Sequence, residues 1–564
     1  MYIVKITLCF VFVLINTVCV FSQEFMEMRN IKVPYNNLIS KYTTWADVDK
    51  DGDLDLYFCN VYNGNNRLLA FKDTGFVQIT ETDITKIGGN AYGSAWADLD
   101  NDGDLDAFVY TIFNDENYLI LNNGDSTYNL IEDSFLTEDN NNTFHAAFCD
   151  IDNDGDQDLY LSFTELFDSA QYENMHNQLY LNDGDGNFSQ ATSLLNEVNF
   201  DTRHISFLDY NGDGWFDVFL ANFQGPNLLF KNNKGVFEID MDAFPVKDQF
   251  YASNTSAIGD IDSDGDLDIY VVNVNSDNQL FVYENGKYVS QNNTNILTKD
   301  YISGHAVFTD FDVDGTLDLY SNDIDEKRNI IHIGLLKGNA WLGVKLKGLK
   351  SNAFGVGAKV GVLVNGKWQY QQVASKNGAP MSGEYTLLFG LDKAKSIDSI
   401  KVFWPSGIIQ AHSNLAAFQY VVIEEGHSYY KLDIRKLAEN ETALLKDVAV
   451  RAIASFSQEN RYLTVSVLYT NLGLAPTDVS IDLKLNKQMS LTRSFPKINK
   501  QDQRTYTWNI KDVVPGKDGV ITMIFQLEEL FEELIGEAVI FPIDFDEKKS
   551  NNTYKLSKRF NIPN

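Results

Sequence analysis

Residues 46–57 read ADVDKDGDLDLY, and this stretch recurs five more times along the chain. The other copies are ADLDNDGDLDAF (97–108), CDIDNDGDQDLY (149–160), LDYNGDGWFDVF (208–219), GDIDSDGDLDIY (259–270) and TDFDVDGTLDLY (309–320). The first aspartates of successive copies are 51, 52, 59, 51 and 50 residues apart. Self-similarity at a nearly fixed period of this length indicates a repeat architecture with six units.

Short strand-like runs surround each copy of the motif. In the first unit TTW (43–45) precedes it and LDLYFC (54–59) overlaps its end. Such runs, rich in aromatic and β-branched residues and bounded by Gly, Asn and Asp, are typical of strands. In each of the first five units two more runs follow around turn residues, as in NRLLAFKDTGF (66–76). Asn-Gly or Asp-Gly at several of these turns is typical of a β-hairpin.

Each unit therefore predicts four strands in about 50 residues, which is typical of a β-propeller blade. We predict an all-β protein whose residues 23–336 form a six-bladed propeller, with a seventh, degenerate blade left open. The segment EFMEMRNIKV (24–33) resembles a fourth strand, and the last unit stops after RNIIHIG (328–334). The two ends are expected to complete one blade and close the ring.

The aspartates follow the spacing D-x-D-x-D-G-x-x-D, which predicts about six Ca²⁺ sites. Ca²⁺ takes roughly six to eight oxygen ligands, and alternate residues of a tight loop can point inward together. Positions one, three, five and nine would supply side-chain oxygens, and position seven its backbone carbonyl. The predicted ligands are Asp47, Asp49, Asp51, Asp53 and Asp55; Asp98, Asp100, Asp102, Asp104 and Asp106; Asp150, Asp152, Asp154, Asp156 and Asp158; Asp209, Asn211, Asp213, Trp215 and Asp217; Asp260, Asp262, Asp264, Asp266 and Asp268; and Asp310, Asp312, Asp314, Thr316 and Asp318.

Other metals and motifs fit this spacing less well. An EF-hand needs a bidentate Glu at position twelve, where these units carry Phe58, Val109, Leu161, Leu220, Val271 and Ser321. Zinc is disfavoured because no His or Cys enters the loops. Mg²⁺ usually keeps several waters and takes fewer protein ligands. Plain surface turns would leave like charges crowded together in six loops.

The net charge is concentrated in the repeat region. Of the 79 acidic and 45 basic side chains, residues 1–340 hold 56 and 17, a net charge of −39, and residues 341–564 hold 23 and 28. Such a field repels polyanions and anionic membrane surfaces, so nucleic acid is excluded as a partner. Bound cations would relieve the self-repulsion of the repeat region.

The units resemble FG-GAP/VCBS repeats, which occur in integrin-α-like propellers and in many secreted bacterial proteins. The resemblance covers roughly residues 25–336. It implies that each acidic loop binds Ca²⁺ between the first two strands of a blade. The fourth unit departs from the pattern through Asn211, Gly212 and Gly214, so its site is expected to be the weakest.

Two further β domains are predicted after the repeats. Residues 337–427 resemble the ASPIC/UnbV domain, which follows such repeats in secreted proteins of the cartilage acidic protein group. The resemblance rests on residues 339–346, Ser351-Asn352, 355–360, 389–391 and Trp404-Pro405-Ser406-Gly407. Residues 440–564 carry six or seven short alternating runs, such as YLTVSVLYTNLG (462–473), which predict an immunoglobulin-like sandwich.

The first 22 residues have the pattern of an export signal. Lys5 precedes an apolar run from Ile6 to Val20, and Ser22 is a small residue at the expected cleavage point. The run is shorter than the ~20 residues of a membrane-spanning helix, so we expect no membrane span after cleavage; a lipoprotein site at Cys19 is a further alternative. A secreted, periplasmic or cell-surface protein is predicted. Cys59 and Cys149, left after cleavage, are expected to be buried thiols rather than a disulfide.

The sequence carries no catalytic motif such as G-x-S-x-G, H-E-x-x-H or a phosphate loop. His145, His204 and His305 each lie five residues before the first Asp of their units, and Arg203 adjoins one of them. These four residues form a candidate ligand face at the end of the first strands away from the acidic loops; packing within the ring is the alternative. We predict a non-enzymatic module that binds an extracellular or surface protein or glycan. The alternatives are a lyase acting on acidic polysaccharide and a structural envelope or matrix component.

Overall fold

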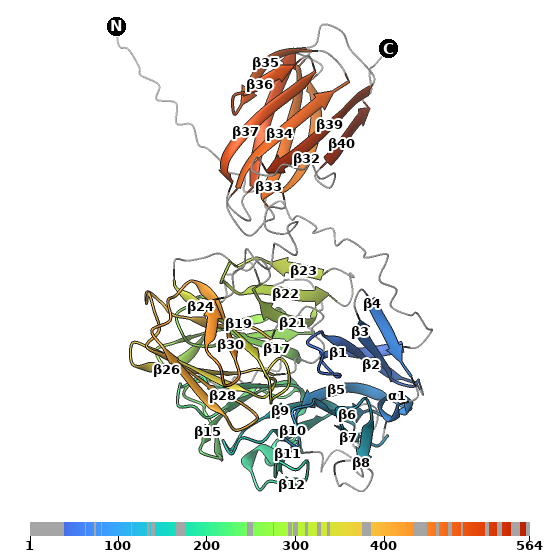
Figure 1. Ribbon diagram of the computed structural model, residues 1–564, viewed down its shortest axis with the longest axis vertical. Coiled ribbons are helices and arrows are strands. Elements are labelled where there is room, and N and C mark those ends of the chain that lie inside the picture. The colour runs from blue at the N-terminus through green and yellow to red at the C-terminus, as the bar shows by residue number, and fades with distance from the viewer. Residues whose placement is uncertain are drawn as a thin grey trace, which may run out of the picture.

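The structure is a computed structural model, and strands dominate it (Figure 1). It describes residues 39–431, 448–542 and 553–559 apart from the internal stretches 63, 73–74, 81, 114, 132–135, 137–141, 165–175, 245–251, 275, 292–295, 297–302, 311–313, 324–328, 335–338, 375–384, 458–461, 472–476, 487–488, 503, 514–517 and 527–532. The predicted export signal, the predicted N-terminal strand at 24–33 and the ligand Asp312 lie outside the described residues. Beside the strands, the described part holds the short helix α1 (Asp83–Lys86) and the 3-10 turn η2 (Leu194–Glu197).

Each of the six predicted units forms one antiparallel sheet whose strands follow chain order, which confirms the propeller. The first three blades are β1 (Ile39–Ala46), β2 (Asp55–Val61), β3 (Arg67–Lys72) and β4 (Gly75–Ile79); β5 (Ala91–Ala97), β6 (Asp106–Thr111), β7 (Tyr118–Asn122) and β8 (Tyr128–Ile131); and β9 (Thr143–Cys149), β10 (Asp158–Phe163), β11 (Gln178–Asn182) and β12 (Phe188–Gln190). The next three are β13 (Asp201–Leu208), β14 (Asp217–Gln224), β15 (Leu228–Asn233) and β16 (Val236–Ile239); β17 (Ser253–Gly259), β18 (Asp268–Asn273), β19 (Gln279–Glu284) and β20 (Lys287–Gln291); and β21 (Ser303–Thr309), β22 (Asp318–Asp323) and β23 (Asn329–His332). In the described residues the sixth blade thus has three strands.

The first and sixth blades touch near the axis of the propeller. Tyr42 of β1 and His305 of β21 pack edge to face with ring centroids 5.4 Å apart, and the Tyr42 hydroxyl lies 3.3 Å from His305 Nε2. Six blades lie within the described residues, and a seventh, degenerate blade stays a prediction.

The acidic motif has the same register in every blade. The residue before its first Asp pairs with the Asp at position nine, as in Ala46↔Asp55 and Cys149↔Asp158. The loop between these partners joins the first and second strands, at the place that the family resemblance implied.

Residues 341–431 form a second domain of two four-stranded sheets. One sheet holds β27 (Leu387–Gly390), β24 (Trp341–Lys347), β30 (Gln419–Glu424) and β31 (Tyr429–Lys431), with β24 and β30 parallel; the other holds β26 (Lys367–Gln372), β25 (Lys359–Val364), β28 (Ser399–Phe403) and β29 (Ile409–Ser413). β31 extends the domain past the predicted boundary at residue 427. Its apolar core is continuous with that of the first two blades, since one buried cluster contains both Trp96 and Phe389.

The C-terminal strands form two sheets around one core. The sheets are β32 (Val448–Ser457), β33 (Tyr462–Asn471), β38 (Asp518–Gln526) and β35 (Ser490–Phe495); and β36 (Lys500–Asp502), β37 (Thr505–Val513), β34 (Thr477–Leu485), β39 (Glu533–Pro542) and β40 (Thr553–Arg559). Val465 and Met523 of the first sheet share a buried cluster with Ile481 and Trp508 of the second. The predicted sandwich is present, and its immunoglobulin-like character stays a prediction.

Two smaller predictions concern the thiols and the membrane. Cys59 and Cys149 are buried and unpaired, as expected. Within the described ranges, no helix has the length and apolarity that crossing a membrane requires.

Candidate metal sites

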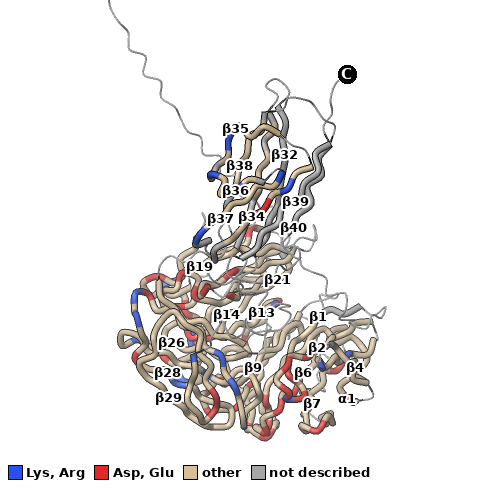
Figure 2. Tube along the Cα trace, turned by 45° about the horizontal axis from the view of Figure 1, so that its top comes forward, with Lys and Arg blue, Asp and Glu red and all other residues tan. Residues whose placement is uncertain are grey.

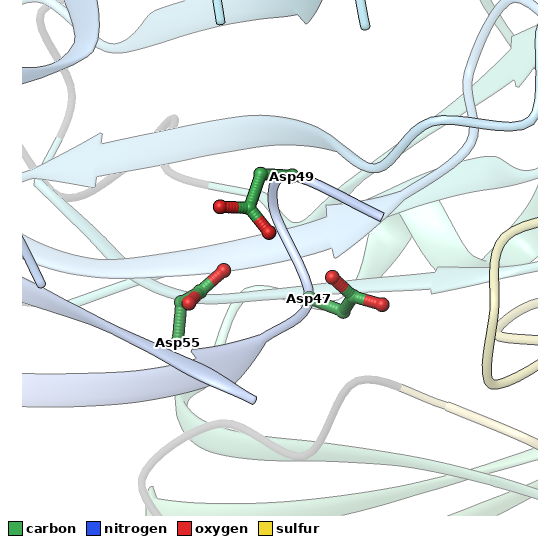
Figure 3. Close-up of side chains that lie close together, drawn as sticks. All are labelled: Asp47, Asp49 and Asp55. Atoms are coloured by element: carbon green, nitrogen blue, oxygen red, sulfur yellow. The ribbon is translucent and has the colours of Figure 1, made fainter. Parts of the chain in front are cut away.

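The acidic loops bring the carboxylates of positions one, three and nine together. In the first blade Asp47 and Asp49 from the loop and Asp55 from the start of β2 gather around one point (Figure 3). The second, third and fifth blades repeat this arrangement, and in each group one oxygen per residue lies within 4.8 Å of the others. The three further groups are Asp98, Asp100 and Asp106; Asp150, Asp152 and Asp158; and Asp260, Asp262 and Asp268. Acidic residues (red) occur along the loops of the propeller body in Figure 2.

Positions one and five also shape the loop through hydrogen bonds. The position-one carboxylate accepts from the glycine at position six, as in Gly52 N to Asp47 Oδ2 at 3.0 Å. The position-five carboxylate accepts the backbone N–H of position seven, as in Asp53 N to Asp51 Oδ1 at 3.0 Å. The glycine has φ +90 at Gly52, a conformation that other residues adopt at a cost. The acidic spacing thus holds the turn that gathers the ligands.

Position nine has a structural role that sequence reasoning missed. Asp158 accepts hydrogen bonds from Ile151 N at 3.0 Å and Asn182 N at 2.9 Å. The equivalent aspartates bind the same two backbone positions in the other blades, for example Asp106 with Leu99 N and Asn122 N. Each position-nine carboxylate therefore ties the loop to the third strand of its blade.

The burial and hydrogen bonding of the carboxylates fit a cation-binding site. Asp49 Oδ1, Asp98 Oδ1, Asp150 Oδ1 and Asp266 Oδ1 are buried and have no hydrogen-bond partner among the described residues. Burial raises the pKa of Asp98 to about 7, with the Asp102 and Asp100 charges adding to the shift. A buried carboxylate without a partner is costly, and a hard cation with oxygen ligands removes that cost. The residues present therefore fit Ca²⁺.

The fourth and sixth loops show fewer of these features among the described residues. In the fourth, Asp209 accepts from Gly214 N at 2.9 Å, and Asn211 places a neutral side chain at position three. In the sixth loop, the backbone N–H of Gly315 donates to Asp310 Oδ2 at 2.6 Å. Side-chain ligation by Trp215 and Thr316 at position seven was not expected. Their backbone role, and the ligand role of positions five and seven in every loop, stay predictions.

The first loop holds a cation of its own. Lys72 Nζ, from the end of β3, donates to Asp51 Oδ2 at 2.7 Å and also to Asp49 Oδ2. The four structurally equivalent positions carry Asn123, Asp183, Asn233 and Glu284. The ammonium group and Ca²⁺ compete for the same carboxylates, so Lys72 lowers the affinity expected of the first loop.

Replacing Lys72 by Asn should therefore increase the response to calcium. We expect the gain in unfolding free energy on adding calcium to rise by about 1 kcal/mol in Lys72→Asn, because no exposed ion pair has to break first. Chemical denaturation with and without calcium measures this gain. Lys287→Asn, an exposed lysine of the fifth blade, is the control; a gain no larger than in the control contradicts the competition.

Asparagines link the first four blades at their acidic loops. Asn122, Asn182 and Asn232 lie at the ends of the third strands of blades two, three and four. Their side-chain amides donate to the position-two carbonyl of the preceding blade at 2.9, 2.9 and 2.8 Å, on Val48, Leu99 and Ile151. The sequence signal is an Asn just before the hairpin turn in these three units, where units one and five carry Phe71 and Tyr283. These bonds tie neighbouring blades to each other from the first to the fourth.

The second domain lies against all six acidic loops. Its contacts include Tyr385 Oη to Trp45 O at 2.9 Å, Lys350 O against Gly103, Gln372 Nε2 to Gln157 Oε1 at 2.6 Å, Lys359 Nζ to Gly214 O at 3.4 Å, Asn339 Nδ2 to Asp262 O at 2.8 Å, and Tyr420 Oη to Asp310 Oδ2. Sequence reasoning missed this docking. It places the candidate metal loops at an interface between two domains.

A cavity of about 290 Å³ lies on the propeller axis. The first strands of blades two to six line it, and residues 370–372, 386–388 and Tyr420 of the second domain line it as well. His145, His204 and His305 all contribute to its wall, as their shared position predicted. The rings of His145 and His204 lie 4.6 Å apart, and His204 Nδ1 lies 3.1 Å from Ser256 Oγ.

Burial lowers the pKa of two of these histidines, His145 and His204. Burial, with His305 nearby, lowers the pKa of His145 to about 3. Burial, with His145 and His305 nearby, lowers the pKa of His204 well below its usual value. Arg203 forms two 3.0 Å bonds to Asp201 and lies over the rings of Phe144 and Phe223. Neutral imidazoles and a paired guanidinium do not favour an anionic ligand on this predicted face.

Two family models match parts of the chain. FG-GAP-like repeats match residues 47–109, 165–220, 209–271 and 260–321, and the ASPIC and UnbV model matches residues 348–429. The chain therefore contains FG-GAP-like repeats and an ASPIC and UnbV domain.

Three curated relatives match the chain at low identity. Cartilage acidic protein 1 from Homo sapiens is 25% identical over 409 residues (64% of this chain, 60% of that protein), and the Mus musculus protein 24% over 415 residues (66% and 62%). The Xenopus tropicalis protein is 27% identical over 292 residues (48% and 43%). The chain thus spans between 43% and 62% of the relatives' lengths. A solved fucose-specific lectin from Aleuria aurantia is similar at TM-score 0.31 and 11% identity, over 53% of this chain and 99% of the lectin; likeness at this level carries no inference about ligands.

Proposed function

We propose that this protein is an exported, calcium-stabilised propeller that acts as a binding module for a protein or glycan outside the cytoplasm. The observation that carries the proposal is the convergence of three carboxylates in each of four described loops at the same register, with one unpartnered oxygen in each of the first three of these groups, on Asp49, Asp98 and Asp150. Ca²⁺ would supply positive charge and a coordination shell at these points. The residues at positions one, three and nine of each loop would hold it.

Calcium bound there would have two mechanical consequences. Position nine already ties each loop to its own third strand, and the amides of Asn122, Asn182 and Asn232 tie loop to loop. Neutralising the loops would therefore stiffen the ring as a unit. It would also remove repulsion beneath the ASPIC and UnbV domain, whose Tyr420 and Asn339 bind the same loops. A rigid scaffold presenting loops is a common basis of recognition.

The face that remains for a partner is the one away from the acidic loops. There the connections between second and third strands, and between successive blades, surround the axis. The ASPIC and UnbV domain contacts the opposite face through all six loops. A binding role therefore directs attention to loops such as 62–66 and 112–117.

The test is capture by the immobilised full chain. The chain would be exposed to surface extracts and to a glycan array, in calcium and in chelator. Retention of a protein or glycan in calcium, and its loss in chelator, supports the proposal. Absence of any retained partner, with a chain that is folded and loaded with calcium, favours a structural role and overturns the binding role.

A further inference from the structure

An exposed tyrosine, Tyr62, stacks on a partly buried phenylalanine, Phe113, on the face away from the acidic loops. Tyr62 and Phe113 each lie seven residues after the position-nine Asp of their units, just past the ends of β2 and β6. Their rings stack with centroids 6.0 Å apart and planes inclined by 29°. Tyr62 is 66% exposed. The pair therefore forms a ring surface at the junction of the first two blades.

The backbone at both positions is strained. Tyr62 has φ 60 and Phe113 has φ 63, the left-handed region that bulky residues rarely adopt. This conformation costs roughly 1–2 kcal/mol per non-glycine residue. The other units carry Glu165, Gln224, Asn275 and Asp325 at this position. Two bulky residues therefore hold a costly backbone conformation, and the stacking of their rings offsets part of the cost.

Polar side chains are bound to the backbone that carries Tyr62. Asn90 accepts the backbone N–H of Tyr62 at 2.9 Å through Oδ1, and its amide donates to Asp115 Oδ2 at 2.8 Å. Gly89 makes room for this carboxylate, because a Cβ there would lie 2.8 Å from Asp115 Oδ2. Asp115 is half-buried and held at one oxygen. An amide and a fixed carboxylate next to a flat apolar surface match the hydroxyls and the C–H face of a sugar.

The geometry points to a glycan-binding site at Tyr62 and Phe113, specific for neutral sugars. Two considerations choose this occupant, and both rest on the binding role proposed above. The polar groups of the site are an amide and a carboxylate, within a region of net charge −39, so an acidic glycan is repelled. Two rings are also far smaller than the roughly 800 Å² per partner that a stable protein interface needs. Tyrosine is one of the residues that most often contribute a large share of the binding energy at recognition sites.

The experiment uses the full chain in calcium on a printed array of neutral and acidic glycans. We expect retention by neutral glycans, and titration of the best neutral glycan should show at least about a tenfold loss of affinity in Tyr62→Gly and Phe113→Gly. Glycine relieves the left-handed strain, so Tyr62→Gly, at an exposed position, should melt no lower than the unmodified protein. Phe113→Gly also loses packing against the core and should melt somewhat lower. Tyr62→Phe keeps the ring and should bind within a few fold. Tyr62→Asn is a second variant without the aromatic ring, and Asn also tolerates the left-handed backbone at this position.

Tyr430→Ala, an exposed tyrosine of β31 in the other domain, is the matched control and should bind like the unmodified protein. Unchanged affinity in both glycine variants overturns the assignment of the site while the binding role stands. Retention of acidic glycans or of proteins alone overturns the neutral-sugar assignment. Retention of nothing overturns the site and the binding role together.

Discussion

Asp158→Ala should destabilise the calcium-loaded protein by about 3–5 kcal/mol. The side chain is buried, accepts two backbone N–H groups and belongs to the carboxylate group of the third blade. Each buried N–H left without an acceptor costs about 1–3 kcal/mol, and a calcium ligand is lost as well. Urea denaturation in calcium, followed by tryptophan fluorescence, measures the change.

Asp185→Ala is the control for Asp158→Ala. It removes one negative charge from the same blade at an exposed position outside the acidic loop. We expect a change within about 0.5 kcal/mol, as is usual for surface substitutions. If both variants lose the same small amount, position nine is not the structural and metal-binding point that we describe.

Glu425→Gln should cost about 2–4 kcal/mol by releasing the loop that covers the second blade. One oxygen of Glu425 accepts N–H groups of Leu349, Lys350 and Ser351 at 2.7, 2.7 and 2.9 Å, and the other accepts the hydroxyls of Ser351 and Ser406. A glutamine can keep its oxygen towards the three N–H groups only if its amide donates to the two serine hydroxyls, which must then turn to accept. It also loses the negative charge, and hydrogen bonds to a charged group are the stronger ones. Denaturation of the full chain reports the loss through Trp341 and Trp404.

The same carboxylate predicts a pH dependence. Burial alone would raise the pKa of Glu425, but the hydrogen bonds from Ser406 and the backbone N–H groups outweigh it and lower the pKa. Its contribution is therefore present above the unfolded-state pKa of about 4.3 and is lost as the pH falls through the lower folded value. Glu424→Gln, which removes only a surface pair with Lys347, should cost less than about 1 kcal/mol. Equal losses in the two variants, at every pH, would contradict this role.

The repeat made most of the fold predictable. Six copies of one motif, with strand-like runs at fixed offsets, indicate the blades, and the alternating acids indicate loops that gather at Asp47, Asp49 and Asp55. Local chemistry determines these features, because turn residues and strand periodicity act within about ten residues of each other. The equivalent positions of the three histidines on the first strands of their blades were predictable for the same reason.

Long-range contacts were not predictable from the motif. Lys72 contacts the first loop from the end of another strand. The second domain contacts the loops through residues that share no sequence pattern, such as Asn339 and Tyr420. The second role of position nine also depends on where the third strand lies. Tertiary packing decides which residues contact the acidic loops from other strands or from the second domain. The repeated motif therefore predicts the metal ligands but not the residues that position them.

The most direct test of the account is the melting temperature of the unmodified chain in about 10⁻² M calcium and in excess chelator. Extracellular calcium modules have Kd values of roughly 10⁻⁴–10⁻³ M, so each loaded loop should add roughly 1–3 kcal/mol of stability at about 10⁻² M calcium. Summed over several loops, this predicts a melting temperature higher by at least about 10 °C in calcium. Identical melting in both buffers, with no metal found by elemental analysis of the protein, would contradict the central claim.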